Sequence, residues 1–180
     1  KALSTVSTSR VFMGGGGGSG HNNLSNFSSE GGDGGGIIIL LADTIITNNF
    51  AITASGTAGK SITNSGAEGA GGGAGGGSIL VSTRYITGTL GLFAEGGDGG
   101  DVTSGTAGPG GGGGGGFIAV PAASQLNSGA SIISSVSGGA AGTLSAPSNN
   151  YGATAGSSGL QNNALALNTQ PQNVPDSSFF

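Results

Sequence analysis

The chain has 180 residues, of which 43 are glycine and 5 are proline, and only 7% of them are charged. Four scattered Lys and Arg residues against eight Asp and Glu residues cannot bind a phosphate backbone, so we exclude nucleic acid as a partner. The absence of cysteine excludes disulfides and thiolate metal sites, and no apolar run reaches the length of a membrane-spanning helix. Such a glycine content is typical of disorder, but regularly spaced apolar runs predict an ordered chain.

The N-terminal region, residues 1–30, is expected to be an extended segment followed by a glycine-rich cap. An incomplete opening unit is expected over Val6–Met13, and a run of five glycines follows it. The chain does not begin with Met and shows no signal peptide at Lys1, so we expect a mature exported protein or a sequence that omits its leader.

The first complete unit begins at the apolar run Ile37–Leu41, which is typical of a β-strand. Two further strands are predicted over Thr44–Thr47 and Ala51–Ala54. Asn48 and Asn49 predict the turn between these strands, because asparagine tolerates positive φ. A glycine-rich excursion follows over residues 55–77.

The same pattern recurs about forty residues later, which indicates an internal repeat. A shift of forty places Ile39 on Ile79, Ile46 on Ile86 and Ile52 on Leu92. A third copy is predicted from Phe117, continuing through Leu126 and Ile132, and the pattern fades after Tyr151.

This repeat predicts an all-β fold, a parallel β-helix or solenoid of about three coils whose inward Ile, Leu, Val and Phe side chains form a ladder. The solenoid repeats are assigned to residues 31–150. Residues 151–180 are predicted to be a polar C-terminal tail or cap.

The glycine runs are predicted to pack beside the solenoid as polyglycine-II-like extended helices. Without Cβ atoms, such backbones can approach closely and pair their N–H and C=O groups. In the second unit, Gly96–Gly100 would run outward and Gly108–Gly116 would return, with an exposed tip between them. The alternative is that the runs are flexible linkers.

The stretch GGGSILVSTRYITGTLGLFAEGGDGGDVTSGTAGPGGGGGGGFIAV resembles glycine-rich parallel β-helix segments of bacterial and archaeal extracellular surface proteins. The resemblance covers roughly residues 31–140 and implies shape more than function. A second resemblance is to the tail-fibre tip adhesins of T-even-like phages, which carry variable loops on a polyglycine sandwich. That resemblance implies a receptor-binding role on a virion.

The sequence contains few candidate catalytic or metal-binding residues. His21 is the only histidine, and we expect it to be an exposed loop residue. Asp98 and Asp101 lie in a stretch that matches the glycines and aspartate of the calcium repeat G-G-x-G-x-D-x-U-x, but Thr103 replaces its apolar eighth residue. The alternatives are a calcium site and a solvated acidic turn. With Glu95 they form the only acidic cluster, and we expect neither enzymatic activity nor a cofactor.

We expect a non-catalytic extracellular structural subunit that assembles with copies of itself into a filament or surface layer. The alternative is a phage or cell-surface adhesin whose polar loop tips bind a receptor or polysaccharide. Low charge and apolar termini favour self-association. The apolar terminal residues expected to take part are Leu3, Val6, Val11, Phe12, Phe179 and Phe180. The alternative is that the termini fold back as caps on their own domain.

Overall fold

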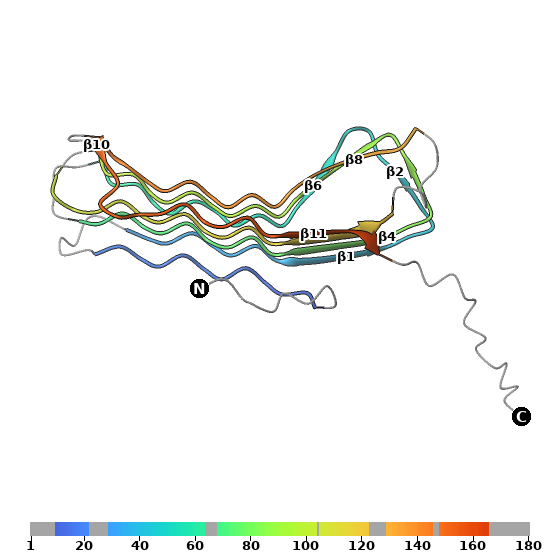
Figure 1. The fold of residues 1–180 in the computed structure, drawn as a ribbon, viewed down its shortest axis with the longest axis horizontal. Helices are drawn as coiled ribbons and strands as arrows, with labels where there is room; N and C mark the ends of the chain where they lie inside the picture. Colours follow the sequence, from blue (N-terminus) through green and yellow to red (C-terminus); the bar gives the residue numbers. More distant parts are fainter. Residues whose placement is uncertain are drawn as a thin grey trace, which may run out of the picture.

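A computed structural model describes residues 10–21, 29–63, 68–103, 105–122, 129–145 and 148–165. Over these residues the protein is all-β and contains no helix, so none of them forms a helix able to cross a membrane. Most strands gather at one end of an elongated molecule, and wavy extended segments run side by side toward the other end (Figure 1).

Parallel pairing joins strands from successive units of the chain. The main sheet has the order β1-β4-β7-β11, a second sheet pairs β2 with β5, and a third has the order β3-β6-β8. A short antiparallel pair, β9 with β10, lies at the far end of the molecule (Figure 1). The strands are β1 (Ile37–Leu41), β2 (Thr44–Ile46), β3 (Ala51–Thr53), β4 (Ser78–Ser82), β5 (Tyr85–Thr87), β6 (Thr89–Phe93), β7 (Phe117–Pro121), β8 (Ser131–Ser135), β9 (Leu144–Ser145), β10 (Ser148–Asn149) and β11 (Leu160–Leu165).

The three strands predicted for the first unit are confirmed within one residue at their ends. Their Ile and Thr residues favour extended backbone because two substituents on Cβ restrict χ1. The turn predicted at Asn48 and Asn49 is also present, and Asn49 has a φ of 63°. The second unit turns at Gly88, whose φ is 85°, a conformation that glycine adopts without steric cost.

The predicted shift of forty residues holds for only part of the repeat. It is correct for β3 and β6, where Ile52 lies opposite Leu92. It is wrong by one residue for β1 and β2, because Ile38, not Ile39, pairs with Ile79, and Ile45 pairs with Ile86. The second unit has one residue fewer between its β5 and β6 strands, and a uniform shift cannot represent that deletion.

The repeat continues beyond Tyr151, where we expected it to fade. Leu160 lies opposite Phe117 in a parallel pairing, so β11 adds a fourth strand to the main sheet. Half of the residues in its sequence, LQNNAL, are polar, and it lacks the continuous apolar run that marked strands such as β1 and β7. In the third unit, Ile132 lies opposite Leu90 as part of β8, whereas Leu126 lies outside the described residues.

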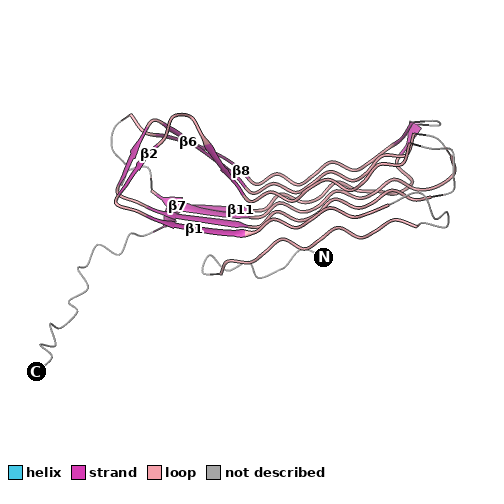
Figure 2. Cartoon of the chain, turned by 180° about the vertical axis from the view of Figure 1, so that it is seen from behind, coloured by secondary structure: helices cyan, strands magenta, loops and turns pink. Residues whose placement is uncertain are grey.

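The extended segments between strands form two layers that continue the sheets (Figure 2). Segments II, IV, VI and VIII lead into β1, β4, β7 and β11, and segments III, V and VII leave β3, β6 and β8. Segment I lies against segments II and IV, on the side away from III and V. The segments are I (residues 10–21), II (29–36), III (54–62), IV (69–77), V (94–102), VI (108–116), VII (136–143) and VIII (153–159).

Backbone hydrogen bonds with a three-residue period hold these segments together, at N···O distances between 2.7 and 3.1 Å. In segment IV, Gly72 donates to segment I, Gly73 donates to segment VI, and Ala74 donates to segment III. Three residues per turn is the period of a polyproline II helix, which makes no hydrogen bonds within itself. The glycine runs are therefore packed and paired, and the linker alternative is wrong for the described segments.

The core lies between the sheets at the strand-bearing end. Its most buried members come from the second and third units, and Ile79, Leu92 and Ile118 are each 0% exposed. A smaller cluster formed by Ile62, Ala70, Val102 and Leu144 closes the opposite end of the glycine layers. The glycine segments thus span two apolar anchors, which fix both of their ends.

Candidate assembly surfaces

The first unit leaves one end of the core incompletely covered. Ile38, Leu40, Ile45 and Ile52 point toward the core but are only partly buried. Their partners in the second unit, Ile79, Val81, Ile86 and Leu92, are 0–2% exposed. The second unit is covered by a unit on each side, whereas no described strand lies beyond β1, β2 or β3. We call this surface the open end.

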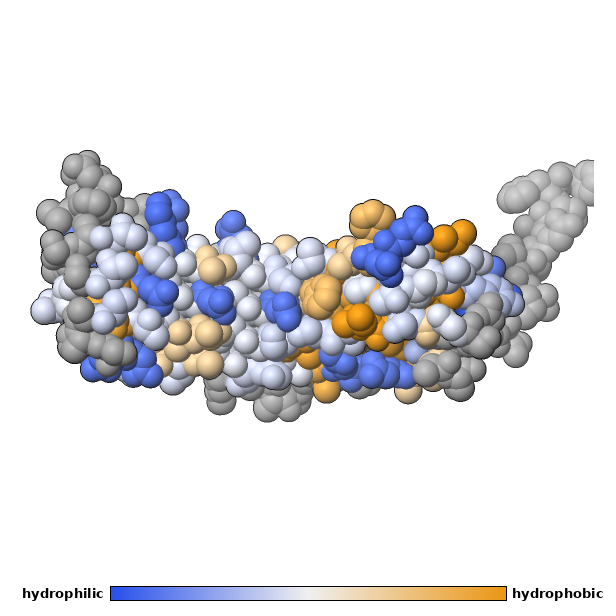
Figure 3. All heavy atoms as spheres, turned by 90° about the horizontal axis from the view of Figure 1, so that it is seen from above, coloured by the Kyte–Doolittle hydropathy of each residue, from blue (hydrophilic) through white to orange (hydrophobic). Residues whose placement is uncertain are grey.

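Large apolar side chains surround the open end. Ile39 is 55% exposed, Ile46 77% and Phe50 74%, and Ile37 and Leu41 on β1 are also exposed. Hydrophobic surface gathers mainly toward the strand-bearing end, whereas the glycine layers are mostly neutral or hydrophilic (Figure 3). Apolar side chains clustered beside unpaired strand edges are typical of an interaction surface.

The last unit ends the core with polar groups. Gln161 of β11 lies opposite the buried Ile118, and Ser134 of β8 lies opposite the buried Leu92. The Ser134 hydroxyl donates a hydrogen bond to the Gln161 side-chain carbonyl at 3.2 Å. This bond joins β8 of the third sheet to β11 of the main sheet. The core therefore ends in partly buried apolar side chains at the first unit and includes hydrogen-bonded polar side chains at the last unit.

The residues predicted for self-association have different positions. Phe12 is held by its own chain, because its N–H donates to the Ser78 hydroxyl at 3.0 Å and its C=O accepts from that hydroxyl at 2.8 Å. Val11 is half-buried next to it in segment I. Leu3, Val6, Phe179 and Phe180 lie outside the described residues, so their predicted role stays a prediction.

The acidic cluster forms a row along segment V, which we call the acidic row. Glu95, Asp98 and Asp101 are three residues apart, so the period of the segment places them on one side. Asp98 accepts from the Ala140 N–H at 2.6 Å, and Asp101 accepts from the Thr143 N–H at 2.7 Å. Glu95 accepts from the Ser135 and Ser137 hydroxyls.

These carboxylates therefore pair with outward groups of segment VII and its preceding strand. Among the described residues, no three His, Asp or Glu side chains are placed to hold a metal ion. The geometry of the acidic row fits hydrogen bonding between segments V and VII, and calcium binding by Asp98 and Asp101 stays a prediction.

Glu68 is a site residue that the sequence did not indicate. It lies just before segment IV and is 0% exposed, and neither of its carboxylate oxygens has a hydrogen-bond partner among the described residues. A buried carboxylate without a donor costs free energy. In the sequence, its only signal is a single charge between a polar loop and a glycine run.

The end of the molecule opposite the strands carries turns and the β9–β10 pair (Figure 1). His21 ends segment I there, and its carbonyl accepts from the Gly69 N–H at 3.0 Å. Tyr151 is 52% exposed, with a φ of 46°.

No protein-family model, curated protein or solved structure significantly matches this chain.

Proposed function

We propose that the protein is a non-catalytic structural subunit, a short glycine-rich β-solenoid flanked by polyglycine-II layers, that associates with copies of itself through the open end. The partial exposure of Ile38, Leu40, Ile45 and Ile52 carries this proposal. Their counterparts in the second unit become buried once another unit lies beyond them, so a unit from a second copy would bury them in the same way.

The non-catalytic part of the proposal depends on how the acidic groups are used. Paired carboxylates can cleave glycosidic bonds when both face a substrate. Here Asp98 and Asp101 accept hydrogen bonds from amides of segment VII. They serve the packing of the glycine layers, which is a structural task.

The experiment compares two lysine substitutions at exposed positions of opposite ends. Ile46, 77% exposed, lies at the open end, and Ile133, 56% exposed, lies on β8. Sedimentation velocity and negative-stain microscopy of the full chain should show association, and Ile46→Lys should abolish it while the circular dichroism spectrum is retained. Ile133→Lys should block association only if the last unit forms the other half of a head-to-tail contact.

Head-to-tail contacts generate filaments unless they close into a ring, whereas contact between two open ends gives a closed dimer. Loss of association in both lysine variants would therefore indicate a filament or layer. A full-length protein that remains monomeric at high concentration would overturn the proposal.

An adhesin is the second candidate, and the gathering of turns at the end opposite the strands favours it. Rigid layers that end in loops are suited to present those loops to a receptor or polysaccharide. Under this proposal the purified protein stays discrete and binds cells. Either function implies an extracellular location, at a cell surface or on a virion, and makes copies of the chain or a surface receptor the partner.

A further inference from the structure

Backbone N–H groups that point outward from the glycine layers have different hydrogen-bond acceptors on the two outer faces. On the face of segments III, V and VII, side-chain oxygens accept hydrogen bonds from several of these N–H groups. The Ser55 hydroxyl accepts from the Glu95 N–H at 3.0 Å, and the Ser61 hydroxyl accepts from the Asp101 N–H at 2.9 Å. The acidic row accepts from the Ala140 and Thr143 amides in the same way. Side chains of this face therefore provide hydrogen-bond acceptors for backbone N–H groups of the same face.

On the opposite face, a backbone segment takes the place of side chains. Segment I donates from Gly14 and Gly17 to segment II, at 2.8 Å in both cases. It accepts from Gly72 and Gly75 of segment IV, at 2.8 and 2.9 Å. Segment I thus fills the groove between segments II and IV and runs antiparallel to both.

The next groove on this face, between segments IV and VI, has the same construction and no occupant among the described residues. The register of β4 and β7 makes Gly111 and Gly114 the counterparts of Gly72 and Gly75. The N–H groups of Gly111 and Gly114 have no hydrogen-bond partner among the described residues. Across the groove, the carbonyls of Ala70, Gly73 and Gly76 also lack one. We call this surface the bare groove.

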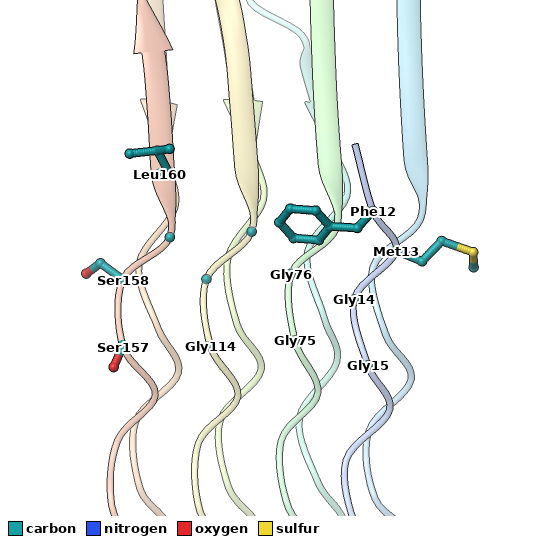
Figure 4. Close-up of a pocket in the computed structure, with 13 residues that line it drawn as sticks. Phe12, Met13, Gly14, Gly15, Gly75, Gly76, Gly114, Ser157, Ser158 and Leu160 are labelled. Atoms are coloured by element: carbon teal, nitrogen blue, oxygen red, sulfur yellow. The ribbon is translucent and has the colours of Figure 1, made fainter. Parts of the chain in front are cut away.

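A hollow of about 700 Å³ opens at the strand-bearing end of the bare groove. Its lining combines backbone of segments I, IV, VI and VIII with the side chains of Phe12 and Leu160 (Figure 4). Phe12 projects from the end of segment I toward Leu160, whereas Met13 points the other way (Figure 4). The hollow lies beside the Phe12 side chain, so this stretch of the groove has room for a further chain.

The glycines that line the bare groove are not required by packing within the chain. A Cβ built on Gly111 would approach no atom closer than 3.5 Å, and one on Gly114 none closer than 3.7 Å. Neither residue has positive φ. In contrast, a Cβ on the intervening Gly113 would lie 1.9 Å from the Ala74 carbonyl oxygen. At Gly72 and Gly75, the counterparts in the occupied groove, a Cβ would lie 3.4 Å from the Gly18 nitrogen and 3.3 Å from the Gly15 nitrogen of segment I, so glycine at Gly111 and Gly114 likewise leaves room for a backbone to lie against segment VI.

We propose that the bare groove binds an extended segment of another polypeptide that carries glycine at every third residue and runs antiparallel to segments IV and VI. Segment I shows why glycine is required at every third residue, because a Cβ on Gly14, Gly17 or Gly20 would lie within about 2 Å of a carbonyl oxygen of segment IV. The bound segment accepts from Gly111 and Gly114 and donates to Gly73 and Gly76.

The rest of this chain does not meet that requirement. Residues 1–9, 22–28, 123–128 and 166–180 contain no glycine, and every glycine segment already has neighbours within the chain. A second copy could supply only its own segment I, which would have to leave its own groove. The partner is therefore a glycine-repeat polypeptide, and this inference is independent of the proposed function at the open end.

The test uses the full chain and, as its probe, a synthetic peptide with the sequence of residues 10–21, which fits the equivalent groove. The control peptide replaces Gly14, Gly17 and Gly20 by alanine. In an amide NMR titration, the glycine peptide should shift the Gly111 and Gly114 signals saturably, and the alanine peptide should bind at least tenfold more weakly.

The matched protein variant is Gly111→Gln with Gly114→Gln, whose side chains have room in the free chain but would occupy the bare groove. It should keep the wild-type circular dichroism spectrum and bind the glycine peptide at least tenfold more weakly. Three results would overturn the proposal: no shift at millimolar peptide, equal binding of both peptides, or shifts confined to Gly72 and Gly75. The last result would mean that the peptide merely exchanges with segment I.

Discussion

Gly113→Ala should destabilise the protein strongly although it adds a single methyl group. The new Cβ would lie 1.9 Å from the Ala74 carbonyl oxygen and 2.3 Å from its carbonyl carbon. Real contacts of this kind are longer than 3.0 Å, so segments IV and VI must separate by more than 1 Å. That movement disturbs the bond from the Gly97 N–H to the same oxygen, now 2.8 Å long.

The expected cost follows from three contributions. Overpacking costs about 1–3 kcal/mol, and the loss of one or two backbone hydrogen bonds adds about 1 kcal/mol each. Replacing glycine by alanine restricts the unfolded chain and returns about 0.4–1 kcal/mol. The free energy of unfolding should therefore fall by about 2–4 kcal/mol, which for a chain of this size lowers the melting temperature by about 4–16 °C.

Thermal and urea denaturation monitored by circular dichroism would measure this change, with Gly111→Ala as the matched control. Gly111 lies in the same glycine run, but its Cβ would have room, so this variant should be as stable as the wild type or slightly more stable. Equal stability of the two variants would refute the inference that segment VI packs against segment IV at Gly113.

Three further changes probe other parts of the structure. Leu92→Ala, at a residue that is 0% exposed, should lower the free energy of unfolding by about 2–5 kcal/mol in urea denaturation, and a loss below 1 kcal/mol would place Leu92 outside the core. Asp98→Ala removes the acceptor for the Ala140 N–H and should cost up to about 1 kcal/mol in the same assay, whether calcium or a chelator is present. Asp33→Ala, whose carboxylate makes no such bond, is its control, and a cost seen only with calcium would favour the metal site. Glu68→Gln should raise the melting temperature, since it replaces a buried carboxyl group that has no hydrogen-bond donor among the described residues, and a decrease would reveal a partner for that carboxyl group.

The sequence predicts the strands and the packed glycine layers because both follow from local physical properties. Ile37–Leu41 favours a strand through its side chains, and the glycine runs favour close backbone packing because they have none. The one-residue error at Ile38 and Ile79 has a physical origin, since consecutive Ile and Leu residues look alike at neighbouring positions. The pairing of β11 was missed because three consecutive polar residues, Gln161, Asn162 and Asn163, interrupt the apolar pattern by which the other strands were recognised.

The surfaces were less predictable than the fold. Low charge predicted self-association in general, but the difference between the open end and the polar last unit depends on which residues meet across the sheets. The bond between Ser134 and Gln161 joins residues 27 positions apart, and no local pattern marks it. Gly111 and Gly113 are identical in sequence, and only the three-dimensional packing separates a crowded position from an uncrowded one.

The uniform composition of segment VI has a consequence for how its length can change. Residues 110–116 are all glycine, so sliding this stretch by one residue recreates the same contacts and the same hydrogen bonds. Its alignment is set from outside, by the pairing of Phe117 in β7. A glycine inserted into this run would displace only the turn before it, so the loop would lengthen while the layers stayed unchanged. Segment V has no such freedom, because Asp98 and Asp101 recur every third residue and pin it to segment VII.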